Sequence, residues 1–193
     1  MGDRRQGFGR YRVDLDAYER RVRNGPCFVC GIVARDPDTP AHHVVYEDGQ
    51  TIAFLNHYPT LYGYTLVASK EHREQVTGDF TEEEYLDFQR VVHRVSEAVR
   101  QEVGAERVYL LSLGSQQGNA HVHWHVAPLP PGVPYEEQQF AALMLEEKGT
   151  LEIPEAEKAA LAARIRCRIE RPEGQEQVTP GRRTETLGLE EDQ

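Results

Sequence analysis

Apolar and polar residues alternate over several short segments of the chain, which is the pattern of β-strands with one buried face. The predicted strands are 43–47, 51–56, 64–68, 107–113 and 121–127. The first two strands flank Asp48-Gly49, a dipeptide typical of tight hairpin turns. A short polar loop joins the last two strands, so we expect these two to pair antiparallel.

A different spacing follows the third strand and predicts a long helix. Thr81-Glu82-Glu83-Glu84 matches a capping box, in which Thr81 accepts from a first-turn amide and Glu84 reaches back. Apolar residues then recur three and four positions apart, so we expect the helix to reach Glu102 and to end at Gly104. Further helices are predicted over 14–23, 136–145 and 155–167.

The order of these elements indicates the fold class. Short connections let neighbouring strands pair antiparallel, which favours an α+β domain over a doubly wound one. We expect Pro128-Leu129-Pro130-Pro131-Gly132 to end the sheet, because proline cannot donate to a ladder. The chain divides into a basic N-terminal arm, a central domain, a C-terminal helical extension and a disordered tail, over residues 1–25, 26–133, 134–170 and 171–193.

Charge and cysteine content narrow the function classes. The 193 residues carry a formal net charge of −10, which disfavours non-specific binding to nucleic acid. No apolar run is long enough for a membrane helix and no secretory signal is visible, so we expect a cytoplasmic protein without membrane contact. An odd count of cysteines does not resemble a disulfide scaffold. The arginine-rich arm is either a solvated segment or a cover for a partner subunit.

The strongest chemical signal is a row of three histidines in the last predicted strand. His121, His123 and His125 alternate with apolar residues, so their side chains are expected to share one face. Imidazole suits chemistry near neutral pH, because its unperturbed pKa of about 6.5 lies close by. The pattern therefore predicts a metal site, a nucleophilic site, or one strand that serves both.

A pair of cysteines lies near the N-terminus. Cys27-Phe28-Val29-Cys30 has three interpretations: a redox pair, half of a zinc site, or neither. A redox pair normally opens a helix after a strand, whereas here Asp36-Pro37 breaks the chain soon afterwards. A metal half-site is therefore favoured, with two further ligands from elsewhere in the chain.

Together these segments resemble the histidine-triad (HIT) superfamily, from Cys27 to Pro128. The motifs are His121-x-His123-x-His125, Val45-Tyr46-Glu47-Asp48, Phe54-Leu55-Asn56, Gly63-Tyr64-Thr65-Leu66-Val67 and Lys70-x-His72. The resemblance implies a HIT-like fold, in which an antiparallel sheet of five strands packs against a long helix. It also implies a homodimer whose ligand is a small purine nucleotide.

Members of this family hydrolyse or transfer nucleoside monophosphates from phosphoramidates, dinucleoside polyphosphates and acyl-adenylates. The resemblance assigns the nucleophile to His123, which would attack the α-phosphorus and form a nucleotidyl-histidine. His125 and Gln117 would assist catalysis, and Asn119 would donate to the bound nucleotide. Two alternatives stay open: a dinucleoside polyphosphate phosphorylase, and a nucleotide-binding protein with a structural zinc and little turnover. The acidic balance argues against a third, a DNA-repair deadenylase.

The resemblance also assigns a nucleotide pocket. Asn56 occupies the position at which family members hold the ribose hydroxyls. Phe28, Ile32 and Phe54 occupy positions that line the base pocket, where apolar and aromatic walls accept a purine. An ordinary core role for these three side chains stays equally open.

The metal site follows from the resemblance as well. In bacterial relatives with a C-x-x-C pair, zinc takes both cysteines, the histidine of the Lys-x-His segment and the first triad histidine. The corresponding residues here are Cys27, Cys30, His72 and His121. Four protein ligands leave no open position, so a zinc ion here would be structural. The alternative is an empty site with reduced thiols.

The chain departs from the usual family pattern at two positions. Gly118 stands where many members carry a serine or threonine that assists the leaving group, and Gly63-Tyr64 replaces the usual Gly-His. A polyphosphate leaving group would need little such help. His123-Trp124-His125 and Asn56-x-Tyr58-Pro59 are similar to the branch that acts on dinucleoside polyphosphates.

Overall fold

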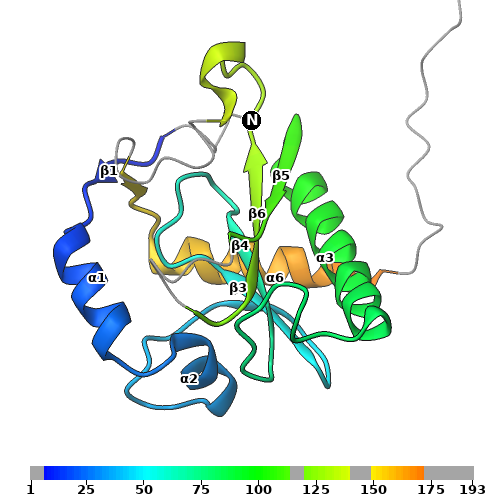
Figure 1. The fold of residues 1–193 in the computed structure, drawn as a ribbon. Coiled ribbons are helices and arrows are strands. Elements are labelled where there is room, and N and C mark those ends of the chain that lie inside the picture. The colour runs from blue at the N-terminus through cyan, green and yellow to red at the C-terminus, as the bar shows by residue number, and fades with distance from the viewer. Residues whose placement is uncertain (1–6, 114–119, 140–148, 172–193) are drawn as a thin grey trace, which may run out of the picture.

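Five antiparallel strands form the central sheet in the computed structural model, which describes residues 7–113, 120–139 and 149–171. Their order across the sheet is β2-β3-β4-β6-β5. Figure 1 labels β3, β4, β6 and β5 of this sheet. The strands are β2 (Val44–Glu47), β3 (Thr51–Leu55), β4 (Thr65–Ser69), β5 (Arg107–Leu111) and β6 (His123–Leu129). The predicted α+β fold with a five-stranded antiparallel sheet is confirmed, and so is the antiparallel pairing of the last two strands.

The helices of the described ranges are α1 (Leu15–Asn24), α2 (Phe28–Ala34), α3 (Glu82–Val103) and α6 (Glu155–Glu170). A short 3-10 helix, η1 (Tyr135–Glu137), begins where a helix over 136–145 was predicted. Most of that predicted helix, and nearly all of the predicted disordered tail, fall outside the described residues. A small second sheet pairs β1 (Arg10–Tyr11) with β7 (Thr150–Leu151).

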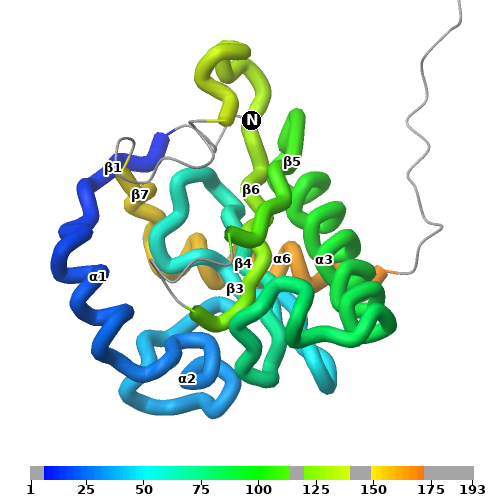
Figure 2. Tube along the Cα trace, in the orientation of Figure 1, coloured from blue at the N-terminus to red at the C-terminus, as the bar shows by residue number. Residues whose placement is uncertain are grey.

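The two faces of the sheet are covered by different helices. On one face Val67, Trp124 and Val126 join a core that contains the apolar sides of α3 and α6. On the other face Phe54 and Leu66 pack with α2. The sheet therefore lies between α2 and α3, as Figure 2 shows. Since His123 and His125 alternate with Trp124 along β6, their side chains belong to the α2 face.

The long helix α3 begins and ends as the sequence predicts. The Thr81 hydroxyl accepts from the Glu84 amide at 3.2 Å, and the Glu84 carboxylate accepts from the Thr81 amide at 2.8 Å. Gly104 ends the helix in the left-handed region, with φ of 59°. Of the helices in the described part of the chain, α3 included, none is long and apolar enough to cross a membrane.

The last strand β6 ends at Leu129, within the segment 128–132 that was expected to end the sheet, and it includes Pro128. Pro128 lies opposite Val108 of β5, whereas pairing with β4 stops at Val126. One side of β6 is thus an unpaired edge at this point, and a proline is tolerated there because no neighbour needs its missing N–H. The strand also starts two residues later than predicted, at His123.

Both flanks contact the central part of the chain. The Arg21 guanidinium of α1 donates to the Tyr58 hydroxyl at 2.7 Å, and the Tyr18 ring packs edge-on against Tyr58. From α6, Leu161 and Ile165 are buried in the core beside α3. These contacts tie the predicted arm and extension to the sheet, and the division of the chain into four regions stays a prediction.

Gly63, in the turn before β4, is expected to be intolerant of any side chain. Its φ is 85°, and an added Cβ would lie 2.6 Å from Val103 Cγ1. We expect Gly63→Ala to lose about 1–2 kcal/mol of stability through backbone strain and roughly 1–3 kcal/mol more through overpacking. Gly132→Ala is the matched control, because Gly132 has a φ of 86° with nothing within 4 Å. Equal losses for the two variants in urea denaturation would contradict the packing argument.

Candidate catalytic and metal site

The ring of His123 is held in one protonation state by the backbone. Its Nδ1 lies 2.7 Å from the carbonyl oxygen of His121. A carbonyl can only accept, so Nδ1 carries the proton and Nε2 keeps its lone pair. Burial lowers the pKa of His123 below its usual value, which favours the neutral ring at pH 7. The result is an imidazole with a nucleophilic nitrogen available.

His125 stands two residues further along the same face of β6. Its ring centroid lies 4.8 Å from that of His123, and burial lowers its pKa to about 3. Its Nδ1 lies 3.0 Å from the hydroxyl of Tyr64, a partner that the sequence did not indicate. The two rings therefore form a neutral pair in which each Nδ1 has an oxygen neighbour.

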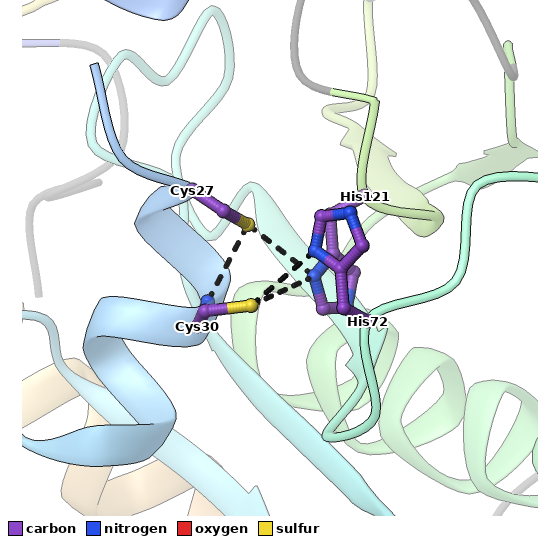
Figure 3. Close-up of side chains that lie close together, drawn as sticks. All are labelled: Cys27, Cys30, His72 and His121. Atoms are coloured by element: carbon purple, nitrogen blue, oxygen red, sulfur yellow. Dashed lines mark hydrogen bonds between the residues drawn. The ribbon is translucent and has the colours of Figure 1, made fainter.

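The first triad histidine does not join this pair. His121 precedes β6 and is fully buried, and its ring faces a cluster with Cys27, Cys30 and His72. The ligand atoms of the four residues all lie within 4.8 Å of one another. Figure 3 shows both sulfurs approaching from α2 and both imidazoles approaching from the opposite side. The structure thus brings together the four residues that the resemblance assigned to zinc.

Three sulfur–nitrogen distances within this cluster suit a tetrahedral metal. Zinc bonds of about 2.3 Å to sulfur and about 2.0 Å to nitrogen separate neighbouring ligand atoms by roughly 3.3–3.8 Å. Cys27 Sγ lies 3.4 Å from His121 Nδ1. Cys30 Sγ lies 3.3 Å from His72 Nδ1 and 3.7 Å from His121 Nδ1. The residues present therefore fit a Cys2His2 centre.

The outer nitrogens of both histidines support the same conclusion. His121 Nε2 donates to the Ser69 carbonyl at 2.8 Å, and His72 Nε2 donates to the Glu74 carboxylate at 3.2 Å. Each bond leaves Nδ1 unprotonated and directed at the sulfurs, which is the arrangement expected around a metal-ligating imidazole. Burial raises the pKa of the Cys30 thiol to about 11, and a bound cation would stabilise its thiolate.

The C-x-x-C pair opens a helix, contrary to the expectation that the chain would break there. Cys27 is the N-cap of α2, and its sulfur accepts from the Cys30 amide at 3.5 Å. The helix has seven residues and ends before Asp36-Pro37. It follows a turn rather than a strand, and the two histidines beside the sulfurs favour metal binding over a redox role.

Of the residues assigned to a nucleotide pocket, Phe28 contacts the ring of His123. The Phe28 ring packs edge-on against His123 with centroids 6.2 Å apart, and against Phe54 at 6.0 Å. Phe54 is fully buried, whereas Phe28 is partly exposed. His42, which the sequence analysis did not single out, packs on Phe54 at 5.3 Å. Ile32 packs in the same apolar cluster, which adjoins the His123 ring through Phe28.

Asn56 directly follows β3, and its side-chain oxygen accepts from the Tyr58 amide at 3.0 Å. Its amide nitrogen can still donate to a ribose oxygen. Gln117 and Asn119, which were expected to assist from the loop before the triad, lie outside the described residues. A cavity of about 280 Å³ lies away from the triad and is lined by Phe8, Arg10, Leu61, Tyr62, Val103, Pro128, Pro130 and Leu151.

Comparison with known proteins identifies the class that this fold and site define. The HIT domain family matches residues 38–131. The protein hit of Bacillus subtilis is 33% identical over 107 residues, which cover 54% of this chain and 70% of that protein. An uncharacterized HIT-like protein of Mycobacterium tuberculosis is 33% identical over 106 residues, covering 53% and 71%. The chain belongs to the HIT family.

Solved structures agree with this assignment. A hypothetical histidine triad nucleotide-binding protein from Sulfolobus tokodaii strain7 is 29% identical, with a TM-score of 0.60 over 75% of this chain and 92% of that one. A histidine triad family protein from Mycobacterium smegmatis, described as Zn-bound, is 22% identical with a TM-score of 0.57, covering 74% and 92%. At that identity the second likeness concerns the fold alone.

Proposed function

We propose that this protein is a nucleotide hydrolase or nucleotidyl transferase that attacks the α-phosphate of a nucleotide conjugate through His123. The observation that carries the proposal is the hydrogen bond from His123 Nδ1 to the His121 carbonyl, which leaves Nε2 as a nucleophile. Membership of the HIT family supports the same chemistry. A phosphoramidate or a dinucleoside polyphosphate is the substrate class that we expect.

The proposed reaction has two displacements. The lone pair of His123 Nε2 forms a bond to the α-phosphorus, while the bond from that phosphorus to the leaving group breaks. A polyphosphate leaves as an anion and an amine leaves after it gains a proton. Water then attacks the nucleotidyl-histidine, loses its proton, and releases the nucleoside monophosphate and the free imidazole. Splitting the reaction in this way replaces one difficult step by two easier ones.

His125 is proposed to donate a hydrogen bond to a phosphoryl oxygen or to the leaving group. It lies on the same face as His123, with ring centroids 4.8 Å apart. A preorganised donor at this position stabilises the charge that grows in the transition state, an effect worth about 3–4 kcal/mol at comparable sites. Gln117 and Asn119 remain proposed as further donors.

The nucleoside is proposed to bind on the α2 side of His123. Phe28 and Phe54 meet edge to face there, and His42 packs on both rings at 6.1 and 5.3 Å. A purine can stack on such a surface with limited discrimination between bases. The amide of Asn56 is proposed to hold the ribose.

We further propose that the cluster of Cys27, Cys30, His72 and His121 holds a structural Zn²⁺. Two thiolates and two imidazoles form a closed tetrahedral set, so the ion would supply no catalytic ligand position. Its role would be to join α2, the segment after β4 and the residue before β6. His121 would then have two roles, because its ring would bind the metal while its carbonyl orients His123.

A product screen by mass spectrometry tests the proposed function. The protein is offered adenosine phosphoramidate, diadenosine polyphosphates and lysyl-adenylate, each with and without inorganic phosphate. We expect AMP as a product from at least one substrate without added phosphate. A strict need for phosphate together with ADP as product would indicate a phosphorylase. Tight nucleotide binding without any product would overturn the proposal in favour of a binding protein.

A further inference from the structure

Tyr64 places a phenol hydroxyl against the third triad histidine. Its Oη lies 3.0 Å from His125 Nδ1, and the two rings stand perpendicular with centroids 5.8 Å apart. Tyr64 is only 5% exposed, so water does not compete freely for this contact. The residue also marks a departure from the family pattern, which usually has a histidine after the glycine at position 63.

The position of Tyr64 is fixed by its neighbours on both sides. Its amide donates to the Leu61 carbonyl at 3.2 Å, and its carbonyl accepts from the Asn56 amide at 2.8 Å. The next residue, Thr65, starts β4 opposite Val126 of β6. The backbone at Tyr64 is therefore held by hydrogen bonds on both sides and by the adjoining strand pairing, which places the phenol beside His125.

The protonation states of Tyr64 and His125 determine which of the two residues donates the hydrogen bond between them. Burial raises the pKa of Tyr64 above its usual value, so the phenol keeps its proton. Burial lowers the pKa of His125, so the ring is neutral and has one N–H. Within the described ranges, His125 Nδ1 is the partner found for the Tyr64 hydroxyl. If the histidine donated instead, the buried phenol proton would lack an acceptor, which is costly.

We propose that Tyr64 is a positioning residue that holds His125 with its proton on Nε2, so that this N–H faces the reacting phosphate. The catalytic role that we give to His125 here rests on the proposed function. The two neighbouring rings then take opposite tautomers for a simple reason. The His121 carbonyl can only accept, which places the His123 proton on Nδ1, whereas the Tyr64 hydroxyl donates to His125 Nδ1. A nucleophilic nitrogen and a donor N–H are thereby set side by side.

The tautomer of His125 can be measured directly by imidazole nitrogen NMR on ¹⁵N-histidine-labelled protein. The His125 signals are assigned by their loss in His125→Asn. We expect an unprotonated, hydrogen-bonded Nδ1 and a protonated Nε2 in the wild type. In Tyr64→Phe we expect the Nδ1-protonated form to appear. Tyr46→Phe is the control, since its hydroxyl donates at 2.7 Å to Asp48 in a hairpin away from the triad.

Turnover provides the second readout. We expect kcat of Tyr64→Phe to fall on the order of 10- to 100-fold, less than for complete loss of an oxyanion donor, with KM nearly unchanged. Tyr64→His should recover most of the lost kcat, because an imidazole N–H can also donate to His125. A wild-type Nδ1–H on His125, or a Tyr64→Phe protein with unchanged tautomer and kcat, would overturn the inference. The tautomer is measured without substrate. A wild type without activity would therefore count against the proposed function, and the spectra would still test the pairing of Tyr64 with His125.

Discussion

Replacing His123 with alanine is expected to abolish turnover and leave the fold intact. The ring supplies the nucleophile in the proposed reaction, and loss of a covalent catalyst lowers kcat by on the order of 10⁴-fold or more. The structural cost is small by comparison, because the side chain is only partly buried and its one described hydrogen bond goes to a neighbouring carbonyl. Steady-state kinetics and thermal unfolding of the same preparation measure both effects.

His93→Ala is the matched control for this experiment. His93 lies on the exposed side of α3, so the variant removes an imidazole without touching the triad. It should retain wild-type turnover and a similar melting temperature. A His123→Ala protein that folds normally and keeps a substantial part of the wild-type kcat would contradict the assignment of the nucleophile.

Removing the proposed zinc ion is expected to cause the largest loss of stability. If free zinc stands about 1,000-fold above its Kd, its binding adds about 4 kcal/mol to the folded state. For a chain of this size that corresponds to a melting temperature lower by roughly 8–16 °C. We expect this shift on treatment with a chelator and in Cys30→Ser. Turnover should fall as well, because the His121 carbonyl that orients His123 would lose its anchor.

Cys167→Ser separates this effect from a general sensitivity to cysteine replacement. Cys167 is exposed on α6 and lies outside the cluster, so the variant should bind one zinc ion per chain and melt like the wild type. Elemental analysis of the purified protein gives the stoichiometry. Protein that contains no zinc, and whose melting temperature does not respond to a chelator, would contradict the structural role.

Much of the fold could be predicted because local patterns and global packing agree. The capping box at Thr81, the apolar stripe of α3 and the hairpin at Asp48-Gly49 each act through near neighbours in the sequence. The segment 128–132 was expected to end the sheet, yet β6 still includes Pro128, because the rule for proline depends on which neighbour is present. Pairing with β4 stops at Val126, and no periodicity along the chain reveals where a partner strand ends.

The candidate site, like the fold, could be predicted only in part from patterns along the chain. The resemblance to the HIT superfamily assigned Cys27, Cys30, His72 and His121 to a metal site, whereas the alternation along the chain placed His121 in a row with the other two histidines. The row is divided in the structure, because β6 starts at His123 and the His121 ring faces the sulfurs. The hydrogen bond from Tyr64 joins residues 61 positions apart, so only the three-dimensional structure could reveal it.

The homodimer and the roles of two loop residues are among the expectations from the sequence that stay predictions. The homodimer concerns a second copy of the chain, and the mass of the protein in solution is the direct measurement. The roles of Gln117 and Asn119 concern residues outside the described ranges. Neither expectation alters the arrangement of His123 and His125, which depends on strand pairing and on two short hydrogen bonds.

Mapping the covalent intermediate tests the central claim most directly. A substrate identified in the product screen is mixed with the protein, the reaction is quenched under alkaline conditions within one turnover, and the peptides are analysed by mass spectrometry. We predict one nucleoside monophosphate added to the peptide that contains His123, with the mass on that residue and absent from His123→Ala. Single turnovers that release product without any adduct on this histidine, or with an adduct on another residue, would contradict the account.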